Sequence, residues 1–572
     1  MKRGKTRMQV VTRVRALALA CVGLFVIAAC GGGGGSSSTI KEGGTLVYAL
    51  DADAATLNPF EAGDVPSVRA FQFMFPNLYQ ADKNLAIVPD LATGPPTVSA
   101  DLKTWTVKIR TDAKWSDGTP ITSADVVKTV QIEANSKLDT DAAFDWSLLT
   151  DPVTGVSAPD ASTIVYTLSA PFAPFFANNL TGFVAPASVY GAVDVTKMRT
   201  FEQDHPTVTG GPFLFDKRVT GSEIDLKANP NYYLGKPHFA AVVEKIITNA
   251  TAAAQAVIAG DVNWDPEITG AAIDTVKAAT GVQSFEYPDL AYYDVRFNDR
   301  ATWVNKSKAT LFGDVNVRRA FAYALDKNAI VKAATDGHGT PLWGDIVPAS
   351  AYYDDSAVVK YAQDIAKAKG LMDAAGWTLG SDGIRVKNGQ RFSAKFYVRA
   401  DKPQRVKAVQ IMSDQLRTNL GMDLVPTPTD FKVFYAPIMA GNFDLALAGF
   451  GLALDPDDYT IFSGKQIAPE VNSNGSNWTG YQNPALDAAI DAERTDLKAT
   501  AADTFAARKA DFATIEHILG DNVVSYMLWA DNVGMGFNGV AGVVTGNGGS
   551  LNYADQDRNV QVFAQWSLVS PK

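Results

Sequence analysis

The densest group of side chains that could do chemistry is the acidic stretch "LDPDDY" at residues 454–459. Its carboxylates, Asp455, Asp457 and Asp458, could hold a cation or begin a helix. A twelve-residue calcium loop needs a central glycine and a terminal glutamate, and this stretch lacks that pattern. Aspartate is favoured at helix N-caps and proline at the first helical position. We therefore expect Asp457 and Asp458 to cap a helix.

Residue types that serve in catalysis are scarce. The four histidines stand far apart in the sequence, and the chain contains no H-E-x-x-H, no G-x-S-x-G and no G-x-x-x-x-G-K-[ST] motif. Among 61 Asp and Glu residues, some carboxylate pair will by chance lie at the separation found in glycoside hydrolases. A secreted hydrolase is therefore kept as a lesser alternative. We expect no enzyme activity, no cofactor and no metal site.

Cys30 is chemically distinctive because it ends an apolar run and precedes a Gly/Ser tract. Six Lys and Arg and no acid precede the uncharged, mostly apolar segment 16–29. This order is typical of a secretory signal, and the apolar run is shorter than the roughly 20 residues that a membrane-spanning helix needs. The residues "IAAC" that end at Cys30 resemble a bacterial lipobox. We predict a signal peptide at residues 1–29, lipidation of Cys30, and a flexible tether at residues 30–42.

The rest of the chain is acidic. Residues 1–29 hold six of the 51 Lys and Arg, so the remainder carries a net charge of −16. Such a surface disfavours nucleic acid and anionic lipid as partners. With Cys30 lipidated, no thiol remains for a disulfide or for catalysis. The length allows more than one hydrophobic core.

Strand-like and helix-like segments alternate, which favours α/β layers. The segment "TWTVKIR" alternates Trp105, Val107 and Ile109 with polar residues, the period of a half-buried strand. Ser123 follows a turn and is a candidate N-cap for a helix rich in valine. Asp314 is a candidate N-cap for the later amphipathic segment "VNVRRAFAYAL". Beyond the Gly/Ser tract, the chain shows no tandem repeat or low-complexity region.

Six segments, in this order along the chain, resemble the extracytoplasmic solute-binding proteins of family 5, the oligopeptide, dipeptide and nickel type. These proteins are the receptors of ATP-driven importers. The resemblance covers most of residues 43–530. The segments are "PDLA" (89–92), "DLKTWTVKIRTDAKWSDGTPITSADVV" (101–127), "TGGPFLF" (209–215) with "LKANPNYYLGKP" (226–237), "DVNVRRAFAYALDKNAIV" (314–331), "AKGLMDAAGW" (368–377) and "FDLALAGF" (443–450).

This resemblance implies an α/β fold of the periplasmic-binding-protein type II, class C: a two-lobed, hinge-bending receptor with an extra subdomain in lobe I. On this basis lobe I is placed at residues 43–291, with the subdomain insertion at about 86–207. Lobe II is placed at residues 292–528, and residues 529–572 return to lobe I. The chain is expected to be a monomer.

The resemblance also implies a function. The protein is expected to be the substrate-binding lipoprotein of an ABC importer, held on the outer side of a bacterial membrane. It would capture di- and oligopeptides in the cleft between its lobes and deliver them to a membrane permease. A nickel chelate, a sugar or another small solute is the alternative ligand. A surface adhesin or a signalling co-receptor is a further alternative to transport.

The family's peptide-binding members imply where the ligand contacts lie. They carry an aromatic residue after a glycine, and three residues later an acid that holds the ligand's α-ammonium group. Here Phe450 fills the aromatic place and Gly451 follows it, but the third residue after Phe450 is Ala453. Either Asp455 takes the ammonium role in a longer loop, or the ligand has no free N-terminus at this point.

Two other segments contain candidate ligand contacts. Asn477 and Trp478 stand on a Gly/Ser/Asn loop, where the indole could stack on a ligand or fill the lobe interface. Asp51, Leu57 and Asn58 follow the first predicted strand and could lie at the rim of the cleft. Asn58 with the proline after it could equally form only a turn.

Overall fold

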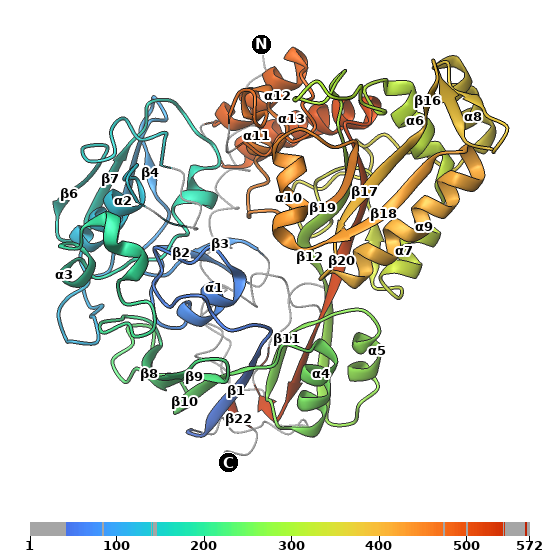
Figure 1. Ribbon diagram of the computed structural model, residues 1–572. Helices are drawn as coiled ribbons and strands as arrows, with labels where there is room; N and C mark the ends of the chain where they lie inside the picture. Colours follow the sequence, from blue (N-terminus) through green and yellow to red (C-terminus); the bar gives the residue numbers. More distant parts are fainter. Residues whose placement is uncertain are drawn as a thin grey trace, which may run out of the picture. The chain divides into compact units, whose positions relative to one another are not determined.

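The computed structural model describes most of the chain beyond residue 41 (Figure 1). Cys30 and the predicted signal peptide lie outside the described residues. Within the described part, no helix combines the length and the apolar character that crossing a membrane requires. The described residues are 42–82, 85–138, 140, 146–472, 475–498, 501–541, 543 and 567–568.

One large mixed sheet is the frame of the fold. Its strands follow the order β18-β17-β19-β12-β20-β11-β1-β10-β9-β8, and β13 pairs with β20 beside this path. The strands are β1 (Thr45–Leu50), β8 (Phe213–Val219), β9 (Glu223–Ala228), β10 (Ala241–Ile246), β11 (Trp264–Ile268), β12 (Val282–Phe297), β13 (Gly339–Pro341), β17 (Ser393–Arg399), β18 (Asp423–Thr429), β19 (Leu445–Gly451) and β20 (Ser525–Asn538).

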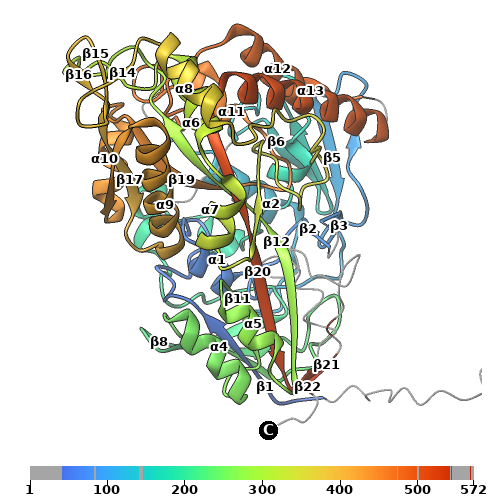
Figure 2. The ribbon, with the colours of Figure 1, turned by 90° about the vertical axis from the view of Figure 1, so that its right-hand side faces the viewer.

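The strands β12 and β20 connect the two halves of this sheet. They have 16 and 14 residues and lie antiparallel beside each other (Figure 2). The N-terminal half of β12 pairs with the C-terminal half of β20, which also pairs with β11. The other half of β12 pairs with β20 and β19. The register shifts between Pro288 and Tyr292, where proline cannot donate a backbone hydrogen bond. We name the half with β1 and β11 the first lobe and the half with β17–β19 the second lobe.

Helices pack on the sheet of the second lobe around a core of fully buried aromatic residues, including Phe297, Phe321 and Trp529. Asp314 accepts a hydrogen bond from the backbone N–H of Asn316, so the predicted cap of α6 is confirmed. The helices of this half are α6 (Val315–Ala324), α7 (Lys327–Ala334), α8 (Ile365–Ala374), α9 (Pro403–Leu420), α10 (Phe431–Met439), α11 (Tyr459–Phe462), α12 (Pro484–Thr495) and α13 (Ala501–Asn522).

A separate four-stranded sheet, in the order β4-β5-β7-β6, packs with α2 around its own core. The predicted periodicity is confirmed, because Trp105, Val107 and Ile109 are all buried. The predicted N-cap of α2 is wrong by one residue. Thr122 is the cap and forms a capping box with Asp125, so Ser123 is the first helical residue. These elements are β4 (Thr97–Val98), β5 (Thr104–Lys108), α2 (Ser123–Glu133), β6 (Val156–Asp160) and β7 (Thr163–Thr167).

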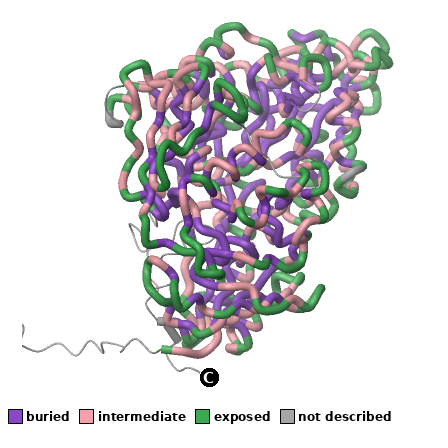
Figure 3. The backbone as a smooth tube through the Cα atoms, turned by 90° about the vertical axis from the view of Figure 1, so that its left-hand side faces the viewer, coloured by how far each residue is buried: buried purple, intermediate pink, exposed green. Residues whose placement is uncertain are grey.

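Buried residues gather in the interior of the molecule, and exposed residues lie mostly along its periphery (Figure 3). The remaining elements are short. They are α1 (Val65–Phe71), β2 (Tyr79–Ala81), β3 (Ile87–Pro89), the π-helix Phe175–Asn179, α3 (Ala187–Tyr190), the 3-10 helices Val195–Thr200 and Gly464–Gln466, α4 (Ala250–Ala259), α5 (Ala272–Lys277), β14 (Thr378–Leu379), β15 (Arg385–Lys387), β16 (Gln390–Arg391), β21 (Val540–Ala541) and β22 (Ser567–Leu568).

Candidate functional site

The C-terminal end of β19 lies beside the crossing strands and carries two of the predicted contacts. Phe450 is paired with Tyr292 of β12, and their ring centres are 5.8 Å apart. The guanidinium carbon of Arg296 lies 4.4 Å from the centre of the Phe450 ring. Phe450 is half-buried, whereas Gly451 and Ala453 are exposed. This strand end therefore presents an aromatic surface and accessible backbone.

A polar network lies next to this strand end. The guanidinium carbon of Arg405, in the first turn of α9, stands 4.3 Å from the centre of the Tyr293 ring. Asp531 accepts a hydrogen bond of 2.6 Å from the indole N–H of Trp529. Burial raises the pKa of Asp531, and hydrogen bonds from Trp529 and Tyr293 oppose that rise. A Cβ atom on Gly449 would lie 2.5 Å from the Tyr293 ring, so this packing requires glycine there.

Sequence reasoning missed Arg405, although the sequence holds a signal for it. Pro403 begins α9, which puts Arg405 in the helix's first turn. A positive charge at a helix N-terminus interacts unfavourably with the helix dipole, so its presence there indicates another role. None of the carboxylates in the described ranges lies within ion-pair distance of Arg405. Its side chain is half-buried and could bond a carboxylate from a ligand.

The first lobe contributes a second charged group at the crossing strands. Arg69 of α1 lies 3.4 Å from Asp51 and 2.8 Å from Glu267 of β11, measured between nitrogen and carboxylate oxygen. The Arg69 side chain is buried, whereas those of Asp51 and Glu267 are 53% and 41% exposed. Burial raises the pKa of the neighbouring Asp265 to about 7. Asp51 is thus the one predicted first-lobe contact that the structure presents to solvent.

Asp455 is bound by another residue of the chain. Its two carboxylate oxygens both bond the guanidinium of Arg508 on α13, one of them at 2.7 Å. The same guanidinium donates to Glu493 at 2.6 Å, and all three side chains are buried. Burial raises the pKa of Asp455, and Arg508 opposes that rise. This geometry argues against capture of a ligand ammonium by Asp455, because its hydrogen-bonding capacity is used within the second lobe.

The expected helix cap is half right. Asp457 accepts a hydrogen bond of 3.0 Å from the backbone N–H of Tyr459, at the start of α11, and pairs with Arg494 at 3.0 Å. Asp458 makes no such capping bond. Its side chain is buried, and the pKa of Asp458 is raised by burial and by the neighbouring Asp345. The contacts of Asp457 are therefore made within the protein, and Asp458 lies in its interior.

Asn477 and Trp478 hold the loop before α12 in place. The Asn477 side-chain amide donates to three backbone carbonyls, at distances of 3.1–3.3 Å, and is fully buried. Trp478 is 6% exposed and packs on Phe450 and Tyr435, with ring centres 5.0 and 5.5 Å away. The indole therefore supports Phe450 from behind, and stacking of a ligand on Trp478 is not favoured by this burial.

Leu57 and Asn58 belong to the core of the first lobe. Both residues are fully buried. The Asn58 side-chain amide donates to the carbonyls of Met198 and Phe201 at 3.0 and 2.8 Å, and its oxygen accepts from the N–H of Phe60. This is the turn-forming role that the sequence left open, and it gives neither residue a surface for a ligand.

Known proteins resemble the chain over most of its length. Residues 86–466 match the model of the bacterial extracellular solute-binding proteins, family 5. The chain belongs to this family. Protein XP55 of Streptomyces lividans is 30% identical over 425 residues, which cover 74% of this chain and 73% of XP55. The oligopeptide-binding protein AppA of Bacillus subtilis is 26% identical over 500 residues, 85% of this chain and 87% of AppA.

Solved structures share the fold of this family 5 protein. AppA in complex with a nonapeptide aligns with a TM-score of 0.75 at 22% identity, over 92% of this chain and 99% of AppA. NikZ from Campylobacter jejuni, in complex with Ni(L-His), aligns with a TM-score of 0.76 at 22% identity, over 91% of this chain and 99% of NikZ. The predicted two-lobed, type II α/β fold is confirmed.

The role of Asp455 can be tested by substitution. We expect Asp455→Asn to lower the free energy of unfolding by about 3 kcal/mol or more, because the buried Arg508 loses the carboxylate that binds it through two hydrogen bonds and keeps only Glu493. Asp401→Asn is the control, since Asp401 pairs with Arg399 at an exposed site and should change stability by about 1 kcal/mol or less. Urea unfolding of both variants measures the difference. A stable Asp455→Asn variant that has lost its ligand would show instead that Asp455 is a ligand contact.

The raised pKa of Asp265 predicts that the stability of the protein depends on pH. Its folded-state pKa of about 7 lies above the unfolded value near 4, so the native state keeps a proton that the unfolded chain loses. Stability from this group is therefore complete below pH 4 and is lost as pH rises through 7. We expect Asp265→Asn to flatten the fall in unfolding free energy between pH 5 and 8, as measured by urea unfolding at each pH. Parallel curves for the variant and the wild type would contradict this.

Proposed function

We propose that this chain is the substrate-binding lipoprotein of an ABC importer and that it captures di- or oligopeptides between its two lobes for a membrane permease. The observation that carries the proposal is the pair of long strands β12 and β20. Each strand extends from one lobe into the other in a family 5 fold. Among the relatives, AppA is named as an oligopeptide-binding protein. The proposed protein acts as a monomer, needs no cofactor, and has no nucleic-acid partner.

The lobe boundaries are part of this proposal. We place lobe I at residues 43–291 with its insertion at about 86–207, lobe II at 292–528, and the return to lobe I at 529–572. The register shift between Pro288 and Tyr292 supports the first crossing. Along β20, pairing with the second-lobe half of β12 ends at Ala530, and this supports a return of the chain to lobe I near that residue.

Binding and closure are coupled in this proposal. A ligand that contacts both lobes stabilises the closed form by its differential affinity for that form. The exposed residues Gly451 and Ala453 offer backbone groups at the end of β19, which suit pairing with an extended peptide. Arg405 supplies a cation for a ligand carboxylate, and Phe450 supplies an aromatic surface. Residues Asp51 and Glu267 supply carboxylates from the opposite lobe.

A non-peptide solute is the second candidate. Ala453 stands where peptide-binding members are expected to hold an acid, and Arg508 occupies Asp455. The ligand's α-ammonium group therefore has no counterion on this loop. NikZ, which shares the fold, was solved with Ni(L-His). A chelate, a sugar or another small solute would fit a cleft without an ammonium site in the second lobe.

Native mass spectrometry of the protein purified from residue 31 onward separates these candidates. We expect a ladder of co-purified peptides that is released on partial unfolding. A single non-peptide mass would favour the second candidate. A protein that carries nothing, and that no peptide library stabilises against heat, would contradict the peptide proposal.

Arg405 gives the sharper prediction for the same proposal. We expect Arg405→Gln to weaken peptide binding about tenfold or more, because a charge-assisted hydrogen bond to a carboxylate is lost. Isothermal titration with a co-purified peptide measures this effect. Arg417→Gln, at an exposed ion pair with Asp423, is the matched control and should leave affinity unchanged. If both variants bound the peptide equally well, Arg405 would not be a ligand contact.

The lipid anchor is also a proposal, because Cys30 lies outside the described residues. A tether on the outer face of the membrane would keep the receptor concentrated near its permease. We expect Cys30→Ala to release the protein from the membrane fraction while its affinity for ligand stays unchanged. Cell fractionation and immunoblotting measure the release. If the variant remained tightly membrane-bound, the anchor would lie elsewhere.

A further inference from the structure

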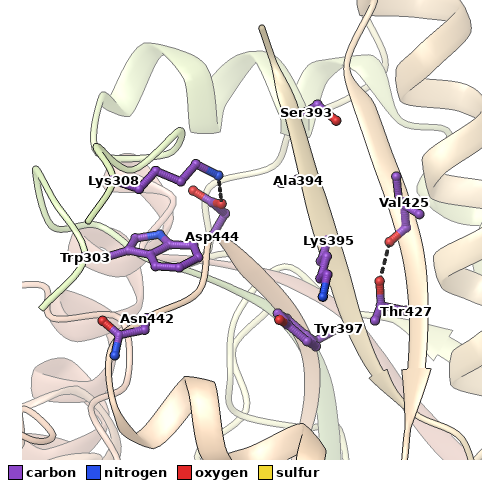
Figure 4. A pocket seen from close by; sticks show the side chains of 10 residues that line it. All are labelled: Trp303, Lys308, Ser393, Ala394, Lys395, Tyr397, Val425, Thr427, Asn442 and Asp444. Carbon is purple, nitrogen blue, oxygen red and sulfur yellow. Dashed lines mark hydrogen bonds and ion pairs between the residues drawn. The ribbon is translucent and has the colours of Figure 1, made fainter. Parts of the chain in front are cut away.

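A pocket of about 610 Å³ opens on the second lobe, on one face of strands β17 and β18 (Figure 4). Asp444, which directly precedes β19, lines the pocket, whereas Phe450 lies near the other end of β19. At about 3.3 Å per residue, six residues of strand separate the two by roughly 20 Å. The pocket is therefore distinct from the candidate site between the lobes. Its volume is that of a site for a small molecule.

The walls of the pocket are fixed before any ligand arrives. Asp444 is buried, bonds the Lys308 ammonium at 2.5 Å, and accepts the backbone N–H of Leu311 at 3.2 Å. The side-chain oxygen of Asn442 accepts the N–H of Asn305 at 3.0 Å. These bonds hold the loop that carries Trp303 against the start of β19. A preformed pocket loses little conformational entropy on binding.

The lining favours an anion. The positive charge of Lys308 is matched by Asp444, and the Lys308 ammonium stands 5.2 Å from the centre of the Trp303 ring. Lys395 is exposed and lies on β17, facing Trp303 across the pocket (Figure 4). No carboxylate of the described residues is within ion-pair distance of its ammonium group. The pocket thus holds one uncompensated positive charge.

The remaining lining supplies apolar surface and hydrogen-bond donors. Trp303 and Tyr397 present aromatic rings, and Val425 on the neighbouring strand is 50% exposed. Burial raises the pKa of Tyr397, with a further contribution from Asp444, so its hydroxyl stays protonated. The amide of Asn442 offers a further donor. Flat apolar surfaces next to donors and a cation suit a ring that bears an acidic group.

We propose that this pocket is a second binding site, which takes a small monoanion with a flat apolar body, such as an aromatic carboxylate. Lys395 pairs with the carboxylate, and the ring lies between Trp303 and the β17–β18 surface. The site is separate from the interlobe cleft and does not depend on the ligand proposed for that cleft. It therefore gives the receptor a second ligand of a different chemical class.

The experiment uses the protein purified from residue 31 onward and three fluorinated probes with the same ring. They are 5-fluoroindole-3-acetate, which is an anion, 5-fluorotryptamine, which is a cation, and neutral 5-fluoroindole. Fluorine NMR line broadening gives the dissociation constant of each. We expect the anion to bind in the millimolar range or tighter, and at least about fivefold more tightly than either of the other probes.

Two variants locate the bound probe. Lys395→Gln removes the uncompensated charge and should weaken binding of 5-fluoroindole-3-acetate at least about fivefold. Val425→Trp fills the pocket from an exposed position on β18 and should abolish the binding. Lys369→Gln, on an exposed face of α8, is the matched control and should change nothing. Thermal unfolding checks that each variant is folded. Failure of the anion to bind, or equal binding to the wild type and both pocket variants, would overturn the proposal.

Discussion

The hydrogen bonding between β12 and β20, which extends through both lobes, is the constraint on which the rest of the fold depends. Buried backbone N–H and C=O groups must be paired, and here one pair of strands satisfies them in both lobes. The pairing is irregular only between Pro288 and Tyr292 and next to Tyr293. Relative motion of the lobes is least costly at this irregular stretch, because few ladder bonds have to change there. Tyr293 of β12 and the buried Asp531 of β20 lie in or next to the same stretch.

A second constraint is the buried charge of the second lobe. Arg508 satisfies Asp455 and Glu493 together, and Arg494 satisfies Asp457, so helices α12 and α13 hold the loop that follows β19. Asn477 holds the loop before α12, and Trp478 packs on Phe450 at the end of β19. Replacing one residue of such an ion pair by a neutral one would leave the other charge buried without that partner. This costs more stability than replacing both charges by apolar residues. The loop beyond Gly451 is therefore held by side chains from distant segments, while its exposed backbone stays accessible.

Much of the fold could be predicted from local patterns. The alternation at Trp105, Val107 and Ile109 and the cap at Asp314 are local signals, and both are confirmed. The site was less predictable, because the partners of its residues are distant in sequence. In the sequence Asp455 looks like an acid that is available to a ligand, but in the fold it is bound by Arg508, 53 residues later. Asn58 likewise looks like a residue of the cleft rim, but in the fold its amide donates to the carbonyl of Met198, 140 residues away. Side-chain availability depends on tertiary contacts that sequence spacing does not reveal.

The position of β20 also has a consequence for how the chain reaches its folded state. Trp264 of β11 pairs with Phe537, so the sheet of the first lobe is complete only when the residues up to Phe537 are present. Pairings of such long sequence separation form slowly. During synthesis the first lobe therefore keeps an open strand edge until the last segments emerge. Strand β20 is therefore the late-arriving element that completes the sheet in both lobes.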